Sequence, residues 1–211
     1  MKKIKSVCLG VVVLLPFFLV ACNMSLADSF FTSIAQGAEL PVEYAIASGD
    51  TGLMLGCLAG LEERLNSGSL SEKERGEIAL DMVDLLAVLS NSMNTLFPYL
   101  LEDSPPEDLS QLESFFATDT AAEYLIRIAE NKLMEYALYA APSPMQLFWG
   151  ILGLVIQEDI VNGGDFTTLN QEQRNLYETL VVRAEQKAEE GTNPDFLPVL
   201  NQLRALFGET P

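Results

Sequence analysis

The sequence predicts an all-α protein, and three observations support this prediction. Apolar residues recur at helical spacing along most of the chain. These stretches begin after Ser, Thr or Asn and end at Gly or Pro, as helices do. No strand-like alternation of useful length is present. We therefore expect a single domain of about seven or eight helices, arranged as an irregular bundle or as a short α-solenoid of helical hairpins.

The chain begins with a segment typical of an export signal. Lys2, Lys3 and Lys5 precede an apolar run over 7–20, which is shorter than the roughly 18–20 residues that a membrane-spanning helix needs. The run ends in Leu-Val-Ala-Cys at 19–22. This stretch resembles the lipobox of bacterial lipoprotein precursors.

The resemblance implies export, attachment of diacylglycerol to the thiol of Cys22, cleavage after Ala21 and acylation of the new amino terminus. It also implies a place in the cell envelope. Because Asn23 is not an aspartate, the sorting rule familiar for enterobacterial lipoproteins indicates the outer membrane, if the organism has one. Ordinary cleavage after Ala27, giving a secreted protein, stays an open alternative.

These signals divide the chain into a signal peptide (1–21), a short lipidated tether (22–28) and a helical domain (29–211). The whole chain carries a formal charge of −18, from 12 Lys and Arg and 30 Asp and Glu. Loss of residues 1–21 removes three basic residues and no acidic one, so the mature charge is −21. A chain this acidic does not bind nucleic acid through its phosphates. Its membrane contact would come through the acyl chains rather than through anionic lipid heads.

The residue types that are missing exclude much chemistry. There is no histidine, which removes histidine acid–base catalysis, Ser-His-Asp and Cys-His nucleophiles, and nearly all zinc sites. Of the three cysteines, Cys8 leaves with the signal and Cys22 would be lipidated, so Cys57 is interpreted as a buried small hydrophobic residue. We expect no enzyme, no catalytic residue, no cofactor and no bound metal.

The first helices of the domain are expected over 30–47, weakly and with interruptions near Gly37 and Pro41, and over 53–65. Three glycines of the second helix recur every four residues and so share one stripe: Gly52, Gly56 and Gly60. Glycines cost stability inside a helix, and close approach of a neighbouring helix explains them best. A partner helix or a ligand is the alternative.

A long helix is expected after the capping box formed by Ser71 and Glu74, and Pro98 should end it. Its apolar stripe contains Ile78, Met82, Leu85, Leu86, Leu89, Met93 and Leu96. Three acidic residues flank the stripe: Glu77, Asp81 and Asp84. We interpret them as a solvated face rather than a metal site, because the di-iron bundle pattern needs histidines.

A short helix is expected over 107–116. A second capping box, at Thr120 and Glu123, predicts a longer one that reaches Ala140. The apolar period of this longer helix includes Ala122, Leu125, Ile126, Ala129, Leu133, Tyr136 and Ala137. It is the best amphipathic segment of the chain.

Ser143 as N-cap and Pro144 at the first helical position open the next helix. Its charge-free run over 145–156 predicts the buried centre of the domain, around Leu152. Two aromatic residues in the run are interpreted as core, with a ligand cavity as the alternative: Phe148 and Trp149. Two glycines there should meet the earlier stripe across a close helix crossing: Gly150 and Gly153.

The glycines at 163–164 end that helix. The neighbouring Asp159, Asn162 and Asp165 do not match EF-hand spacing and are interpreted as a cap and turn. Asn170 starts a further helix that stops at Gly191 and buries Leu176, Leu180, Ala184 and Ala188. The last helix is expected from Asn193 to about Phe207.

Two functions fit this sequence. The first is a membrane-anchored, non-catalytic lipoprotein whose helical surface holds a partner protein at the envelope. The alternative is a carrier of a hydrophobic small molecule or lipid, suggested by the apolar run and the glycine stripe. An enzyme that uses only carboxylates is the weakest hypothesis. Its candidate pairs, Glu62 with Glu63 and Glu189 with Glu190, are adjacent in sequence and do not converge.

Overall fold

Two helices, α4 (Glu72–Leu89) and α10 (Pro144–Asn162), are the elements on which most of the other helices pack. The computed structural model describes residues 41–95, 119–162, 170–190 and 200–201. These residues form eight helices and no strand, so the predicted all-α class is confirmed. The helices belong to one unit, Val42–Pro211.

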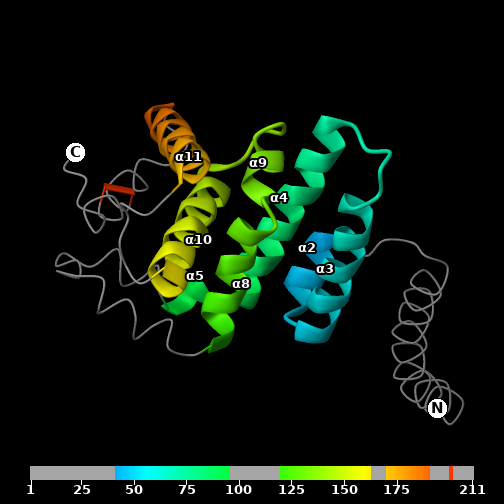
Figure 1. Ribbon diagram of the computed structural model, residues 1–211. Coiled ribbons are helices and arrows are strands. Elements are labelled where there is room, and N and C mark those ends of the chain that lie inside the picture. The colour runs from blue at the N-terminus through cyan, green and yellow to red at the C-terminus, as the bar shows by residue number, and fades with distance from the viewer. Residues whose placement is uncertain (1–40, 96–118, 163–169, 191–199, 202–211) are drawn as a thin grey trace, which may run out of the picture. The chain divides into compact units, whose positions relative to one another are not determined.

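The remaining described helices are α2 (Val42–Ser48), α3 (Thr51–Leu65), α5 (Ser92–Thr95), α8 (Asp119–Glu130), α9 (Leu133–Ala137) and α11 (Gln171–Glu189). Figure 1 shows α11, α10, α8 and α9, α4, and α3 following one another across the view, and neighbours in this order are in contact. In addition, α10 contacts α4, α8, α9 and α11, so it is enclosed on several sides. This is the packing of a bundle rather than of a solenoid, in which each repeat touches only its neighbours.

Three helices start where their sequences predict. The Ser71 backbone N–H donates to Glu74 Oε2 at 2.9 Å, and the Glu74 N–H donates to Ser71 Oγ at 3.3 Å. The Ser71 hydroxyl also donates to Glu74 Oε2, at 2.6 Å, and this bond, followed by the one from the Ser71 backbone N–H, lowers the pKa of the Glu74 carboxyl. Reciprocal caps of the same kind open α10 at Ser143 and α11 at Asn170. A cap of this type satisfies backbone donors that the first turn leaves without a partner, which is why three residues are enough to fix the start of a helix.

Two predicted helices are shorter than their apolar patterns suggest. The first ends at Leu89 instead of running to Pro98. Ser90 Oγ donates to the carbonyl of Ala87 at 2.7 Å and lies 2.7 Å from Ser92 Oγ, and Asn91 adopts a left-handed φ of 56°. Local side-chain hydrogen bonds of this kind compete with the helical ladder, so the chain turns before α5. The predicted apolar stripe therefore does not continue past the end of α4, and Met93 is exposed.

The second shortened helix ends at Glu130, and α9 begins only after Lys132, whose φ is 54°. The helix also starts earlier than predicted, at Asp119, so Thr120 lies inside it and is not its N-cap. The expected capping box at Thr120 is wrong. Ile128 rather than Ile126 is the fully buried isoleucine of α8, because Ile128 shares a face of the helix with the buried Ala122 and Leu125.

The predicted central helix is confirmed. All ten residues from Leu147 to Ile156 are buried, and Leu152 is 1 % exposed. Phe148 and Trp149 belong to this core, with their rings edge to face at 4.9 Å between centroids. In α11, Leu180, Ala184 and Ala188 are buried as expected, whereas Leu176 is half-buried.

The glycines of α10 do allow close approach, but not by α3. A Cβ on Gly153 would lie 2.6 Å from the Leu125 carbonyl oxygen of α8, and one on Gly150 would lie 2.5 Å from Met134 Cγ of α9. The expected crossing between the two sets of glycines is therefore wrong. Gly76 of α4, which the sequence did not single out, makes a third close approach: a Cβ on it would lie 2.9 Å from the carbonyl oxygen of Tyr136.

The glycine stripe of α3 faces the opposite way. Gly52, Gly56 and Gly60 are exposed, and apart from the adjoining residues and the backbone of α3 itself, no described atom lies within 4 Å of a Cβ built on Gly56 or Gly60. The buried residues of α3 are Met54, Leu58 and Leu61. They are offset from the glycines by about two residues, which is roughly 200° around a helix. The buried residues and the glycines therefore lie on opposite faces of α3.

No helix in the described part of the chain is long and apolar enough to cross a membrane. Several expectations lie outside the described residues: the signal peptide, Cys22 and its tether, the segment over 30–40, the helix over 107–116, and Gly191. The same holds for the side chains of Asp159 and Asp165 and for most of the last helix.

Candidate functional site

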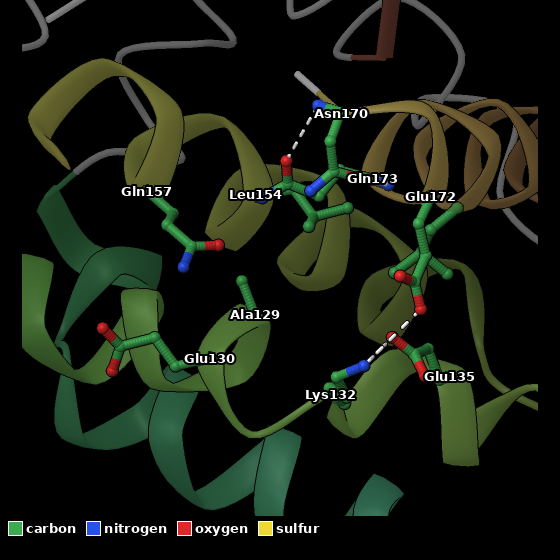
Figure 2. A pocket seen from close by; sticks show the side chains of 10 residues that line it. Ala129, Glu130, Lys132, Glu135, Leu154, Gln157, Asn170, Glu172 and Gln173 are labelled. Carbon is green, nitrogen blue, oxygen red and sulfur yellow. Dashed lines mark hydrogen bonds and ion pairs between the residues drawn. The ribbon is translucent and has the colours of Figure 1, made fainter. Parts of the chain in front are cut away.

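A groove of about 200 Å³ lies where the end of α8, the start of α9, the middle of α10 and the first turns of α11 meet. Figure 2 shows it from close by. We call it the acidic groove. It is lined by Ala129, Glu130, Lys132, Glu135, Leu154, Gln157, Asn170, Glu172, Gln173 and Leu176.

The floor of the acidic groove is apolar. Leu154 is buried, and Ala129 and Leu176 are half-buried. Leu154 comes from the charge-free run of α10 at the centre of the domain, so the groove rests on a rigid, packed element. Figure 2 shows the Gln157 amide reaching from the same helix into the opening.

The rim of the groove is acidic. It carries three carboxylates and one ammonium group, from Glu130, Glu135, Glu172 and Lys132. The residues at its two sides come from separate helices and lie about forty positions apart in the chain, as Lys132 and Glu172 do. The C-terminal end of α8 points its partial negative charge at the same opening. The N-termini of α11, which is capped by Asn170 and Gln173, and of α9, which has no side-chain cap, also lie at this opening, so the helix dipoles offset one another. The charge of the rim is set by three carboxylates against one ammonium group. The groove therefore favours a cation.

Lys132 is the residue that organises the rim. Its left-handed backbone separates α8 from α9 and turns its side chain towards α11. Its Nζ lies 3.5 Å from Glu172 Oε1 and 3.7 Å from Glu135 Oε1. The Glu135 carboxylate, and then that of Glu172, raise the pKa of the Lys132 ammonium. All three side chains remain accessible to water, so these ion pairs are weak.

The acidic flank predicted on α4 is a second polar region. Glu77 is exposed as expected, but Asp81 and Asp84 are half-buried, so the expectation of a fully solvated face is wrong for them. Asp84 Oδ2 accepts a hydrogen bond of 2.9 Å from Gln146 Nε2, at the start of α10. Burial, more than the neighbouring carboxylates, raises the pKa of both aspartates.

The described residues do not assemble a metal site: no three Cys, Asp or Glu side chains among them gather closely enough to hold an ion. Glu62 forms an ion pair with Arg127 of α8, and Glu63 points outward. Cys57 is half-buried rather than buried as expected.

A second, shallower depression of about 490 Å³ runs along α11. Its described lining comes from that helix alone: Asn175, Glu178, Thr179, Val182, Arg183 and Gln186. Because one helix cannot enclose a ligand, we interpret it as open surface. The acidic groove, with four elements around it, is the candidate functional site.

The sequence did not point to this groove. Lys132 falls within an apolar period that runs from Ala129 to Leu133, so it was interpreted as part of a continuous helix. The one available signal was Asn131, since Asn is common where helices end. Comparison of the chain with protein-family models, with curated proteins and with solved structures found no match.

Proposed function

We propose that this protein is a non-catalytic, lipid-anchored interaction module that holds a partner protein at the bacterial cell envelope. The lipobox-like stretch ending at Cys22 supports the anchor and the location. The absence of histidine from the whole sequence supports a non-catalytic role.

One observation carries the choice of a protein partner: the acidic groove is small, open and rimmed by charge. A groove of about 200 Å³ is below the roughly 300–1,000 Å³ of pockets that enclose drug-sized ligands. It suits a side chain presented by another protein. The strong negative charge of the chain would steer such a partner if the partner is basic.

The alternative, a hydrophobic carrier, has less support. A carrier needs a persistent apolar cavity. The helix best suited to line such a cavity is α10. The space beside its glycines is filled by Met134, Leu125 and Ile128 of the neighbouring helices. The described part of α10 is therefore packed against other helices at the positions where a ligand was the alternative.

Site-specific photo-crosslinking in intact cells tests the proposal. Glu130→p-benzoylphenylalanine places a crosslinker at the rim of the groove. Glu178→p-benzoylphenylalanine replaces an equally exposed glutamate on α11 outside it. We expect one protein to be crosslinked at position 130 and not at position 178, and to bind again when purified. Absence of any light-dependent adduct at both positions would contradict the interaction function.

The anchor is tested separately. Cys22→Ala should abolish labelling of the protein by a fatty-acid analogue and block its maturation. An unmodified amino terminus at Asp28 in the mass spectrum would instead indicate a secreted protein.

A further inference from the structure

We infer that the acidic groove receives a long basic side chain, an arginine or a lysine, of the partner protein, and that Lys132 occupies the groove in its absence. This inference rests on the proposed function. It names the chemistry of the partner at the site and the residue that regulates access to it.

The charges around the groove select a cation. Glu130, Glu135 and Glu172 face one lysine, so the rim keeps an excess of negative charge even when Lys132 pairs with two of them. An anionic or neutral guest would meet uncompensated carboxylates.

The floor selects a long aliphatic stem. Leu154, Ala129 and Leu176 supply the apolar part of the lining, next to the carboxylates. Arginine and lysine bury their methylene stems on such surfaces while their charged ends stay at a polar rim. A small metal ion would use the carboxylates and leave this floor uncovered.

Lys132 already shows how a cation is held here. Its ammonium group bridges carboxylates from α9 and α11, at 3.7 and 3.5 Å. These distances are long and the groups are exposed, so the internal pairs are weak and easily exchanged. A guanidinium group can bind one carboxylate through two parallel hydrogen bonds, which an ammonium group does not do. An incoming arginine can therefore displace Lys132, which acts as an internal competitor.

The test measures binding of acetyl-Gly-Arg-Gly-amide to the purified protein in detergent by nuclear magnetic resonance titration. Acetyl-Gly-citrulline-Gly-amide, which has the same shape without the charge, is the control ligand. We expect weak binding of the arginine peptide alone, with shifts at Gln157 and Leu154, and loss of this binding at high salt. Equal binding of the citrulline peptide would overturn the inference.

Three variants separate this model from general charge attraction. Lys132→Asn keeps a residue that tolerates the left-handed backbone and removes the competitor, so binding should tighten roughly two- to five-fold. Glu172→Gln should weaken it by a similar factor. Glu178→Gln makes the same charge change on the same helix outside the groove and should leave binding unchanged. Weaker binding by Lys132→Asn, or equal losses with both glutamine variants, would overturn the inference.

A last comparison distinguishes a protein side chain from a free polyamine. Spermidine should bind no more tightly than the arginine peptide, and tighter binding of spermidine would overturn the assignment to a protein partner. The inference and the proposed function fail separately. A partner that crosslinks at position 130 but binds the Glu172→Gln variant normally contradicts only the inference. Arginine-peptide binding without any crosslinked partner contradicts only the proposed function.

Discussion

Helices α3 and α10 carry the same kind of pattern, apolar residues interrupted by glycines at helical spacing, yet the fold uses the two patterns in opposite ways. The glycines of α10 lie under the backbone of α8 and the side chain of Met134. The glycines of α3 are exposed, and its larger residues Met54, Leu58 and Leu61 make the contacts. The comparison teaches that glycine spacing marks a face but does not say whether another helix covers it.

The largest expected difference between the two helices is in the cost of removing a leucine. Leu152→Ala should lower the free energy of unfolding by about 2–5 kcal/mol, because Leu152 is 1 % exposed and leaves a cavity. Leu55→Ala on α3 is the matched control. Leu55 is 39 % exposed, so its loss should stay below about 0.5 kcal/mol. Urea denaturation measures both values, and equal losses would break the comparison.

The next effect concerns the glycine of α10 that lies under a backbone group. Gly153→Ala should cost about 1–3 kcal/mol, because its Cβ would lie 2.6 Å from the Leu125 carbonyl oxygen. Gly150→Ala should cost less, since it meets the flexible side chain of Met134. Thermal unfolding of both variants checks the order, and the reverse order would contradict the packing described here.

On α3 the same substitution should have the opposite sign. Gly56→Ala should raise the free energy of unfolding by roughly 0.5–1 kcal/mol, because alanine is the better helix former and nothing described lies within 4 Å. Gly49 serves as the control. It also has open space, but its φ of +66° strains any residue with a Cβ, so Gly49→Ala should destabilise. Destabilisation by Gly56→Ala would show that this face of α3 is covered.

The smallest expected effect is a pH dependence of stability that arises on α4, the helix that packs against both α3 and α10. Burial raises the folded-state pKa of Asp84 and Asp81 above the unfolded value. Their protonated forms therefore favour folding, and this contribution is lost as pH rises through the folded pKa. The stability of the protein should fall as pH rises from about 4 towards neutrality. Asp84→Asn, which keeps an acceptor for Gln146, should flatten this dependence, and an unchanged slope would contradict it.

Several of these features follow from local sequence. The starts of α4, α10 and α11 were predicted at Ser71, Ser143 and Asn170, because each cap is completed within three residues. The burial of the charge-free run over 145–156 of α10 was also predicted, because a helical stretch without charge has no face suited to water. The all-α class follows from the same periodicity, which extends over most of the described residues.

Other features were decided by the tertiary structure. The break at Lys132 interrupts an apolar pattern that is still helical by its spacing, and the two helices on either side of it, α8 and α9, both pack on α4 and α10. The outward face of α3 depends on which of its two apolar sides α4 covers.

The acidic groove brings together Glu130, Gln157 and Glu172 from three helices. These residues are far apart in the chain, so no local sequence pattern predicts that they are neighbours. The sequence by itself thus determined where α4, α10 and α11 begin and that α10 is central, since hydrogen bonds within a few residues and the avoidance of buried charge are local effects. The tertiary structure decided which faces meet and where the groove lies, since these depend on contacts between residues far apart in the chain.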